Sequence, residues 1–305
     1  MFISIFLEVI FPILVLMALG VFLQRKYSFK LTPFSTLLTV CFMPASIFLN
    51  LYRVDIDLIV LSQILLYLLL FTVVMMIVGQ LVSWIFRLNG REAVVFKNSI
   101  SLMNSGNYGL PVSQMIFSAN PLGVTIQIFV LVFQNILTYS YGLYNLLSAT
   151  KSLKAIILSF LTMPIIHALI LGILFQSFSI PLPSFIETPL DYLANGFIAL
   201  ALILLGAQLA TIKFGLFHRV VTLSIIGRLL VGPTIALLII FLLDLDGIVA
   251  QSLFIASSFP TSRNTATLAL QYNVEPELHA QAVLYTTLFS CFTVTGVVSL
   301  SMVLF

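Results

Sequence analysis

A polar run that carries glycine and proline, Asn104-Ser105-Gly106-Asn107-Tyr108-Gly109-Leu110-Pro111, lies inside a stretch with no charged residue from position 98 to position 150. A second run, Ser257-Ser258-Phe259-Pro260-Thr261-Ser262-Arg263-Asn264, interrupts another apolar stretch in the second half of the chain. Backbone that leaves the helix at bilayer depth has no water to bond, so it survives only when buried in protein or lining a cavity. Paired interruptions in two halves of one chain are typical of secondary transporters with a midplane site.

The composition places the whole chain in the membrane class. Of 305 residues, 61% are hydrophobic and only 8% are charged, whereas a soluble domain carries roughly a quarter charged residues. A membrane-spanning helix needs about 20 apolar residues. On this basis we predict an all-α membrane protein with ten spans. The predicted spans are 3–24, 31–51, 57–86, 92–118, 122–148, 155–177, 188–210, 217–243, 247–272 and 278–304.

Positive charges in the connections fall almost entirely on one side of these spans. One side receives Arg53 with several acidic residues, and the other receives Arg25, Lys26, Lys30, Arg87, Arg91, Lys97, Lys151, Lys154, Lys213 and Arg219. Because Lys and Arg are enriched in cytoplasmic loops, the pattern predicts a multi-pass cell-membrane protein with both termini outside the cytoplasm. The start of the chain lacks a basic segment before its apolar stretch, so we expect no signal peptide.

Matched spacings indicate an internal repeat. Pro12 and Gly20 in the first span recur as Pro164 and Gly172 in the sixth, and Asn107 recurs as Asn264. The matches divide the chain into a five-helix half at 1–150 and a second half at 151–305. Since five spans is an odd number, the two halves must be inverted relative to the membrane.

Three motifs resemble one family. The run Asn104-x-Gly106-Asn107-x-Gly109-Leu110-Pro111 resembles the fourth-helix break of the auxin efflux carrier family. Leu205-Gly206-Ala207-Gln208-Leu209-Ala210 resembles the end of that family's seventh helix, and Pro260-x-x-x-Asn264 with Leu268-Ala269 and Tyr272 resembles its ninth-helix break. The chain is similar to the bacterial members.

The resemblance carries expectations for fold, motion and substrate. It implies a fold like that of sodium–bile acid symporters and sodium–proton antiporters, with broken helices 4 and 9 crossing. It further implies a scaffold of spans one, two, six and seven, which could form a homodimer and against which the remaining core moves to alternate access. The implied substrates are small organic anions: auxin in plants, and malate, malonate or similar carboxylates in bacteria.

The residue chemistry leads independently to an anion site. A broken helix exposes free N–H groups and a positive dipole end at the start of its second half. Pro111 suits the first turn of a half-helix that begins near Gly109, and Thr261 or Ser262 can cap the other half-helix. Asn side chains donate to carboxylates, and a guanidinium binds them strongly. The candidate substrate-binding residues are Asn104, Asn107, Gly109, Asn135, Arg263 and Asn264.

Each of these candidates has a plainer interpretation. The asparagines could only stitch together the broken backbone, and Arg263 could bond to carbonyls of the crossing helix. Gln127, Gln134 and Asn135 in the fifth span could line the path, although interhelical hydrogen bonding is the more frequent use of such residues. Arg228, within the eighth span, could snorkel toward the cytoplasm or hold a neighbouring helix.

The driving force and the competing classes of protein stay open at this stage. The expected core spans hold no interior Asp or Glu, which favours uniport or anion exchange over coupling through a carboxylate. A sodium-coupled symporter of the bile-acid type and an anion channel remain the alternatives. We find no metal-ligand spacing and no nucleophile–base set, so we expect a protein that is not an enzyme and that has no cofactor, metal or nucleic-acid partner.

Overall fold

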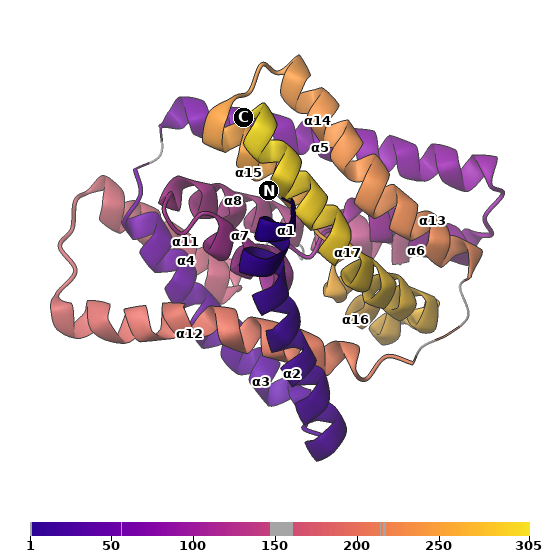
Figure 1. Cartoon of the computed structure of the whole chain (residues 1–305), viewed down its shortest axis with the longest axis horizontal. Coiled ribbons are helices and arrows are strands. Elements are labelled where there is room, and N and C mark those ends of the chain that lie inside the picture. The colour runs from indigo at the N-terminus through magenta and orange to yellow at the C-terminus, as the bar shows by residue number, and fades with distance from the viewer. Residues whose placement is uncertain (1, 56, 147–160, 214, 216–217) are drawn as a thin grey trace.

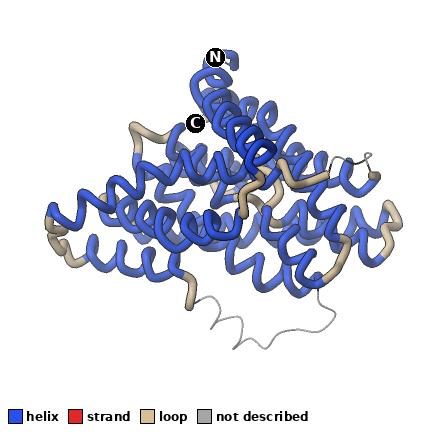
Figure 2. The backbone as a smooth tube through the Cα atoms, turned by 90° about the horizontal axis from the view of Figure 1, so that it is seen from below, coloured by secondary structure: helices blue, strands red, loops and turns tan. Residues whose placement is uncertain are grey.

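The structure is a computed structural model, and it describes residues 2–55, 57–146, 161–213, 215 and 218–305. Helices make up nearly all of this part of the chain, and Figure 2 shows no strand in it. Seven of the described helices are long and apolar enough to span a membrane: Phe2–Tyr27, Leu31–Tyr52, Leu58–Ile85, Pro121–Leu146, Ser184–Leu209, Arg219–Leu242 and Pro276–Leu304. The prediction of an all-α membrane protein is therefore confirmed.

The helix bounds follow the predicted spans to within a few residues wherever the chain is described. The first half contains α1 (Phe2–Ile5), η1 (Phe6–Ile10), α2 (Phe11–Tyr27), α3 (Leu31–Leu37), η2 (Leu38–Phe42), α4 (Met43–Tyr52), α5 (Leu58–Ile85), α6 (Gly90–Ser101), η3 (Ser105–Gly109), α7 (Leu110–Ile116), α8 (Pro121–Leu137), η4 (Thr138–Gly142) and α9 (Leu143–Leu146), where η marks a π-helical turn. The second contains α11 (Pro164–Ser177), α12 (Ser184–Leu209), α13 (Arg219–Ile226), η5 (Gly227–Val231), α14 (Gly232–Leu242), α15 (Gly247–Ser257), α16 (Arg263–Tyr272) and α17 (Pro276–Leu304).

Two of the sequence predictions fall outside the described residues. These are the boundary between the halves, at 150 and 151, and the start of the sixth span at 155, together with Lys151 and Lys154. Within the described part, the sixth span is represented by α11, which begins at Pro164.

Four of the π-helical turns have one physical cause. Each ends two residues before a proline, namely Pro12, Pro44, Pro111 or Pro233. A proline inside a helix has no N–H to donate, and its ring clashes with the carbonyl four residues earlier. Widening the preceding turn to the π form relieves that clash, so the helix continues through the proline.

The first group of helices consists of α2, α3, η2, α4, α11 and α12, and we call it the scaffold group. In it α12 packs against α2 and α4, while α11 packs against α4. The α2–α12 contact is so close that a Cβ added to Gly206 would lie 1.9 Å from the carbonyl oxygen of Met17. At one end Arg53, just after α4, forms ion pairs with Glu187 at 2.6 Å and Asp191 at 2.9 Å on α12. These hydrogen bonds raise the pKa of Arg53 above its usual value.

The second group, which we call the core group, contains α5 to α9 and α13 to α17. Figure 1 shows α5, α13 and α14 on the side opposite α12, with α6, α7, α8 and α15 between them. The N- and C-terminal ends lie close together in both Figure 1 and Figure 2, and α1 contacts α17. The segments that interrupt the helices, at residues 102–104 and 258–262, are buried and therefore lie inside the molecule.

Candidate functional site

The first interruption begins earlier than the sequence indicated. Helix α6 ends at Ser101, its C-cap Leu102 is extended, and helical structure resumes at Ser105. We expected the second half-helix to begin near Gly109 with Pro111 in its first turn. The α-helix α7 does begin at Leu110 with Pro111 in its first turn, but the π-helical turn η3 precedes it, so helical structure starts four residues before Gly109.

The second interruption agrees with the prediction. Helix α15 ends at Ser257, and α16 begins at Arg263 with Ser262 as its N-cap. The Ser262 hydroxyl oxygen accepts from the backbone N–H of Asn264 at 3.3 Å. Arg263 and Asn264 therefore occupy the first turn of the second half-helix, at its positive dipole end.

The two interruptions meet in the interior as a short antiparallel pairing. Met103 and Thr261 form an isolated bridge. On one side the N–H of Asn104 donates to the carbonyl of Pro260 at 2.8 Å, and on the other the N–H of Ser262 donates to the carbonyl of Leu102 at 2.8 Å. Each broken segment thus supplies the hydrogen bonds that the other has lost, which solves the problem of unwound backbone in the membrane.

Side chains from neighbouring helices satisfy further backbone groups at the break. The Gln134 amide oxygen accepts from the N–H of Met103 at 3.1 Å, and the Gln127 amide nitrogen donates to the carbonyl of Ser105 at 2.9 Å. The Thr286 hydroxyl accepts from the N–H of Thr261 at 3.1 Å. Gln127 and Gln134 therefore form interhelical hydrogen bonds, one of the two roles considered for them from the sequence.

Arg228 has a structural role that the sequence alone left open. Its side chain is completely buried, and it donates to the carbonyl of Ile100 at 2.7 Å and to the carbonyl of Ser257. These carbonyls belong to the last turns of α6 and α15, where the two first half-helices end. Arg228 thus holds neighbouring helices and does not snorkel toward a surface.

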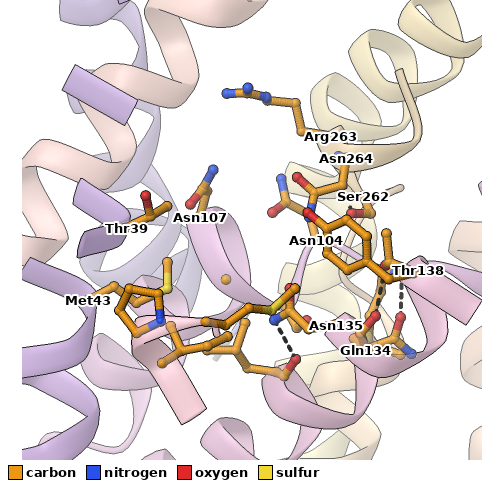
Figure 3. Close-up of a pocket in the computed structure, with 18 residues that line it drawn as sticks. Thr39, Met43, Asn104, Asn107, Gln134, Asn135, Thr138, Ser262, Arg263 and Asn264 are labelled. Carbon is orange, nitrogen blue, oxygen red and sulfur yellow. Dashed lines mark hydrogen bonds between the residues drawn. The ribbon is translucent and has the colours of Figure 1, made fainter. Parts of the chain in front are cut away.

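A cavity of about 290 Å³ lies beside the paired breaks, between the scaffold group and the core group. Figure 3 shows Thr39 and Asn107 on one side and Asn104, Ser262 and Asn264 on the other, with Arg263 reaching across from α16. The residues that line this cavity are Thr39, Met43, Met103, Asn104, Ser105, Gly106, Asn107, Leu131, Gln134, Asn135, Thr138, Tyr139, Met163, Pro164, Ile165, Ser262, Arg263 and Asn264.

Five of the six residues proposed from the sequence line this one cavity. They are Asn104, Asn107, Asn135, Arg263 and Asn264. Gly109 is not among the lining residues. It is buried against Gln127 and Phe259, and a Cβ added there would lie 2.7 Å from both side chains. The position of Gly109 shows close packing, and a substrate contact by its backbone stays a prediction.

The polar groups of the cavity are rich in donors without a partner. The Asn104 amide nitrogen is buried and unbonded, and among the described residues no hydrogen bond or ion pair reaches the side chains of Asn107, Arg263 or Asn264. The Asn135 amide nitrogen, in contrast, donates to the carbonyl of Leu131 at 2.9 Å. Of these donors, the Asn104 amide nitrogen is fully buried, where a donor without a partner is costly, whereas the side chains of Asn107, Arg263 and Asn264 are partly exposed.

Gln134 adds a donor that the sequence reasoning did not select. Its amide oxygen is bonded at the break, but its amide nitrogen is buried without a partner, and the side chain lines the cavity. Arg263 is the single charged residue among the lining residues. The cavity therefore has a positive charge and several free N–H donors, the combination that binds carboxylates.

A second, larger cavity adjoins the first through Arg263, which lines both. It has a volume of about 780 Å³ and lies between α3 and the end of α12 on one side and α16 and α17 on the other. Lys213 and Glu277 are its other charged lining residues. Lys213 belongs to the set of basic residues that the charge pattern of the sequence assigns to one side of the predicted spans.

The fold and the site together define a multi-pass membrane transporter with two broken helices beside a polar cavity. The sequence model of a family described as membrane transport protein matches residues 5–298. The chain therefore belongs to this family, the auxin efflux carrier family that its motifs resemble.

Three curated relatives share parts or most of the chain. An uncharacterised transporter of Methanothermobacter thermautotrophicus is 28% identical over 93% of this chain and 94% of its own. An uncharacterised transporter of Methanocaldococcus jannaschii is 32% identical over 36% of this chain and 35% of its own. A Rhizobium meliloti protein named "Putative malonate transporter" is 32% identical over 41% of this chain and 39% of its own.

Proposed function

We propose that this protein is a secondary transporter that carries small organic anions across the cell membrane by alternating access, without converting them chemically. The observation that carries the proposal is the set of unpartnered groups around the central cavity. Arg263 supplies the single positive charge, and the side chains of Asn104, Asn107 and Asn264 supply donors with no partner among the described residues. A small carboxylate would satisfy all of them at once.

The helix dipoles favour the same occupant. The second half-helices begin at Ser105 and Arg263, and residues of both first turns line the cavity. The first half-helices end on the other side of the break, where their carbonyls contact Arg228. The positive dipole ends therefore face the cavity and the negative ends face away from it, which favours an anion there.

The substrate class follows from charge and size. The cavity holds about 290 Å³ and has one cationic side chain, which suits a small mono- or dicarboxylate. The Rhizobium meliloti relative is named for malonate. Our proposed candidates are malonate, malate and similar carboxylates, with auxin-like aromatic weak acids as the next class to test.

We further propose that the fold consists of ten spans in two inverted five-helix repeats, 1–150 and 151–305, with spans four and nine crossing at their breaks. The reciprocal hydrogen bonds from Asn104 to Pro260 and from Ser262 to Leu102 support a two-fold relation. The paired glycines agree with it. Gly20 on α2 contacts Ile203 on α12, and Gly172 on α11 contacts Phe48 on α4, so the first span packs on the seventh and the sixth on the second.

The orientation and the motion are part of the same proposal. Lys213, at the mouth of the second cavity, is on the side that the positive-inside rule assigns to the cytoplasm, so we infer that the described conformation faces inward. Both termini then lie outside the cytoplasm. The core group moves against the scaffold group to open the cavity to the other side, and two copies associate through the scaffold.

Uptake by purified protein in liposomes tests the proposal. Radiolabelled malonate, malate and an auxin-like aromatic acid are offered with and without an imposed membrane potential. We expect saturable uptake of at least one acid, competition by unlabelled acid, and no competition by a neutral analogue such as the corresponding diamide. Uptake that rises linearly with concentration would indicate a channel, and the absence of uptake of any organic anion would contradict the proposal.

A further inference from the structure

Arg228 is the most unusual charged residue in the described chain. It lies in the π-helical turn η5 and is completely buried. Its two terminal nitrogens donate to the carbonyls of Ile100 and Ser257, while its Nε has no partner. The guanidinium also lies 5.9 Å from the centre of the Phe71 ring, which adds a cation–π contact.

Among the described residues, no carboxylate pairs with this charge. The ion pairs of the described residues involve Arg53, Arg91, His218 and Arg219, with Glu and Asp partners at the ends of helices. A buried unpaired charge is very costly, so the compensation must come from dipoles. Two helix C-termini meet here, and each carries roughly half a negative charge. Together they balance about one positive charge, which is the charge of one guanidinium.

A glycine lies on either side of Arg228, Gly227 at the start of η5 and Gly232 at the start of α14. A Cβ added to Gly232 would lie 3.4 Å from a terminal nitrogen of Arg228 and 3.5 Å from the carbonyl oxygen of Ser257. A Cβ added to Gly227 would lie 2.8 Å from the Ile100 side chain. Gly227 thus lets η5 pack closely against the end of α6, whereas a Cβ at Gly232 would make only ordinary van der Waals contacts near the end of α15.

In transporters with broken helices, the carbonyls at half-helix C-termini are a place where coupling cations such as Na⁺ bind. Here a cation that is part of the chain already occupies the equivalent electrostatic position. We propose that Arg228 is a built-in counter-cation, which takes the place of a metal cation at the paired C-termini and makes anion transport independent of Na⁺. The inference rests on the proposed anion transport. It explains in addition how the negative C-terminal ends of α6 and α15 are neutralised.

The first experiment uses the wild-type protein in liposomes. Initial uptake rates of the transported acid are measured in sodium chloride, potassium chloride and choline chloride at equal ionic strength. We expect equal rates in all three. A rate that depends on Na⁺ would overturn the inference while leaving anion transport intact, whereas the absence of anion uptake in every salt would contradict the proposed function instead.

The second experiment asks whether a free cation can replace the side chain. Arg228→Ala opens a cavity beside the carbonyls of Ile100 and Ser257, and we expect it to lower Tm by roughly 10 °C in choline chloride. Sodium or guanidinium ions at millimolar concentration should restore part of the Tm and of the uptake, in a saturable way. Arg228→Met, which fills the space without charge, should lose uptake and not respond to cations.

The matched control is Arg219→Ala, since Arg219 is half exposed and pairs with Glu92 at a helix end. It should change Tm and uptake little and show no cation response. If Arg228→Ala responds to cations no more than Arg219→Ala does, or if Arg228→Met keeps wild-type Tm and uptake, then Arg228 is not a counter-cation and the inference fails. The wild-type comparison remains decisive if the alanine variant does not fold.

Discussion

At the scale of single residues, the central feature is a group of polar side chains that the fold leaves without partners. Arg263 illustrates it best, since it lies in the first turn of α16, lines both cavities, and has no ion-pair partner among the described residues. The plainer interpretation, in which Arg263 bonds to carbonyls of the crossing helix, has no such contact to support it. We therefore propose that a bound anion is the partner of this charge.

Replacing Arg263 with Gln should therefore weaken anion binding. The substitution retains donors and much of the length but removes the charge, and charge-assisted bonds contribute about 1.5–3 kcal/mol. We expect the apparent affinity for the transported acid to fall roughly 10- to 100-fold, measured as the concentration for half-maximal uptake, with Tm retained. Arg91→Gln is the control, because the Arg91 side chain is 72% exposed. Unchanged affinity, or a loss of stability instead, would make Arg263 a structural residue.

The residue scale also includes groups that hold the break together. The Thr286 hydroxyl accepts from the N–H of Thr261 and donates within its own helix to the carbonyl of Ala282. Thr287, next in the chain, is equally buried but donates only to Val283 in its own helix. The two threonines differ in whether they satisfy backbone of the other broken segment.

Thr286→Val should be more destabilising than Thr287→Val. The first change leaves the Thr261 N–H buried without an acceptor, which costs about 1–3 kcal/mol, while the second removes only a local bond. We expect a lower Tm for Thr286→Val in a thermal-shift measurement on detergent-purified protein. Equal Tm values would show that the Thr286 contact adds no net stability at the crossing.

At the scale of elements, close helix approach at glycine organises the scaffold group. A Cβ added to Gly20 would lie 1.9 Å from the carbonyl oxygen of Ile203, and one added to Gly206 would lie 1.9 Å from that of Met17. The two glycines thus face each other across the α2–α12 contact. Small residues at such contacts are the main device of helix packing in membranes, where burial of apolar surface gives no driving force.

Gly206→Ala should force α2 and α12 apart. Overpacking of this kind costs about 1–3 kcal/mol, so we expect a measurable fall in the Tm of the purified protein and a lower yield of folded protein. Gly296→Ala is the matched control, because nothing lies within 4 Å of a Cβ added there in the middle of α17. That variant should be neutral or slightly stabilised, since alanine favours helix. A Gly206→Ala variant as stable as the control would contradict the close approach.

At the scale of the whole molecule, the central cavity lies between two groups of helices, so movement between them is the natural way to open it. Thr39 and Pro164 of the scaffold group and Asn104 and Arg263 of the core group line the same space. The second cavity is likewise formed by both groups. Alternating access then needs relative motion of the groups and no unfolding within either one.

Linking the groups should therefore stop transport. Cysteines at Thr32 on α3 and Ala280 on α17, which line opposite walls of the second cavity, are joined with a cleavable bifunctional reagent after replacement of Cys41 and Cys291. We expect uptake to fall to background and to recover on cleavage, with Tm not lowered. A pair at Ala266 and Ala280, both in the core group, is the control and should transport after linking. Full uptake by the linked Thr32–Ala280 pair would argue against the motion.

The sequence anticipated the helices better than their ends. Long apolar stretches gave the spans to within a few residues, and the Ser262 cap was recognisable because a serine at that position accepts from the first helical turn. Pro111 marks the first turn of α7 near Gly109, as predicted, but the sequence did not indicate the π-helical turn before it. That turn lets helical structure start earlier, at Ser105.

The sequence by itself determined the membrane class, the two interruptions and five of the residues that line the central cavity. It could do so because polar residues are costly in an apolar span, so their positions carry information without knowledge of their partners. Only the tertiary structure decided what each polar group touches. Arg228 spans the ends of α6 and α15, Gln134 bonds to Met103, and Gly109 packs on Phe259. These contacts join residues that are far apart in the chain. The spacing of residues within one helix cannot show which helix ends come together in the fold.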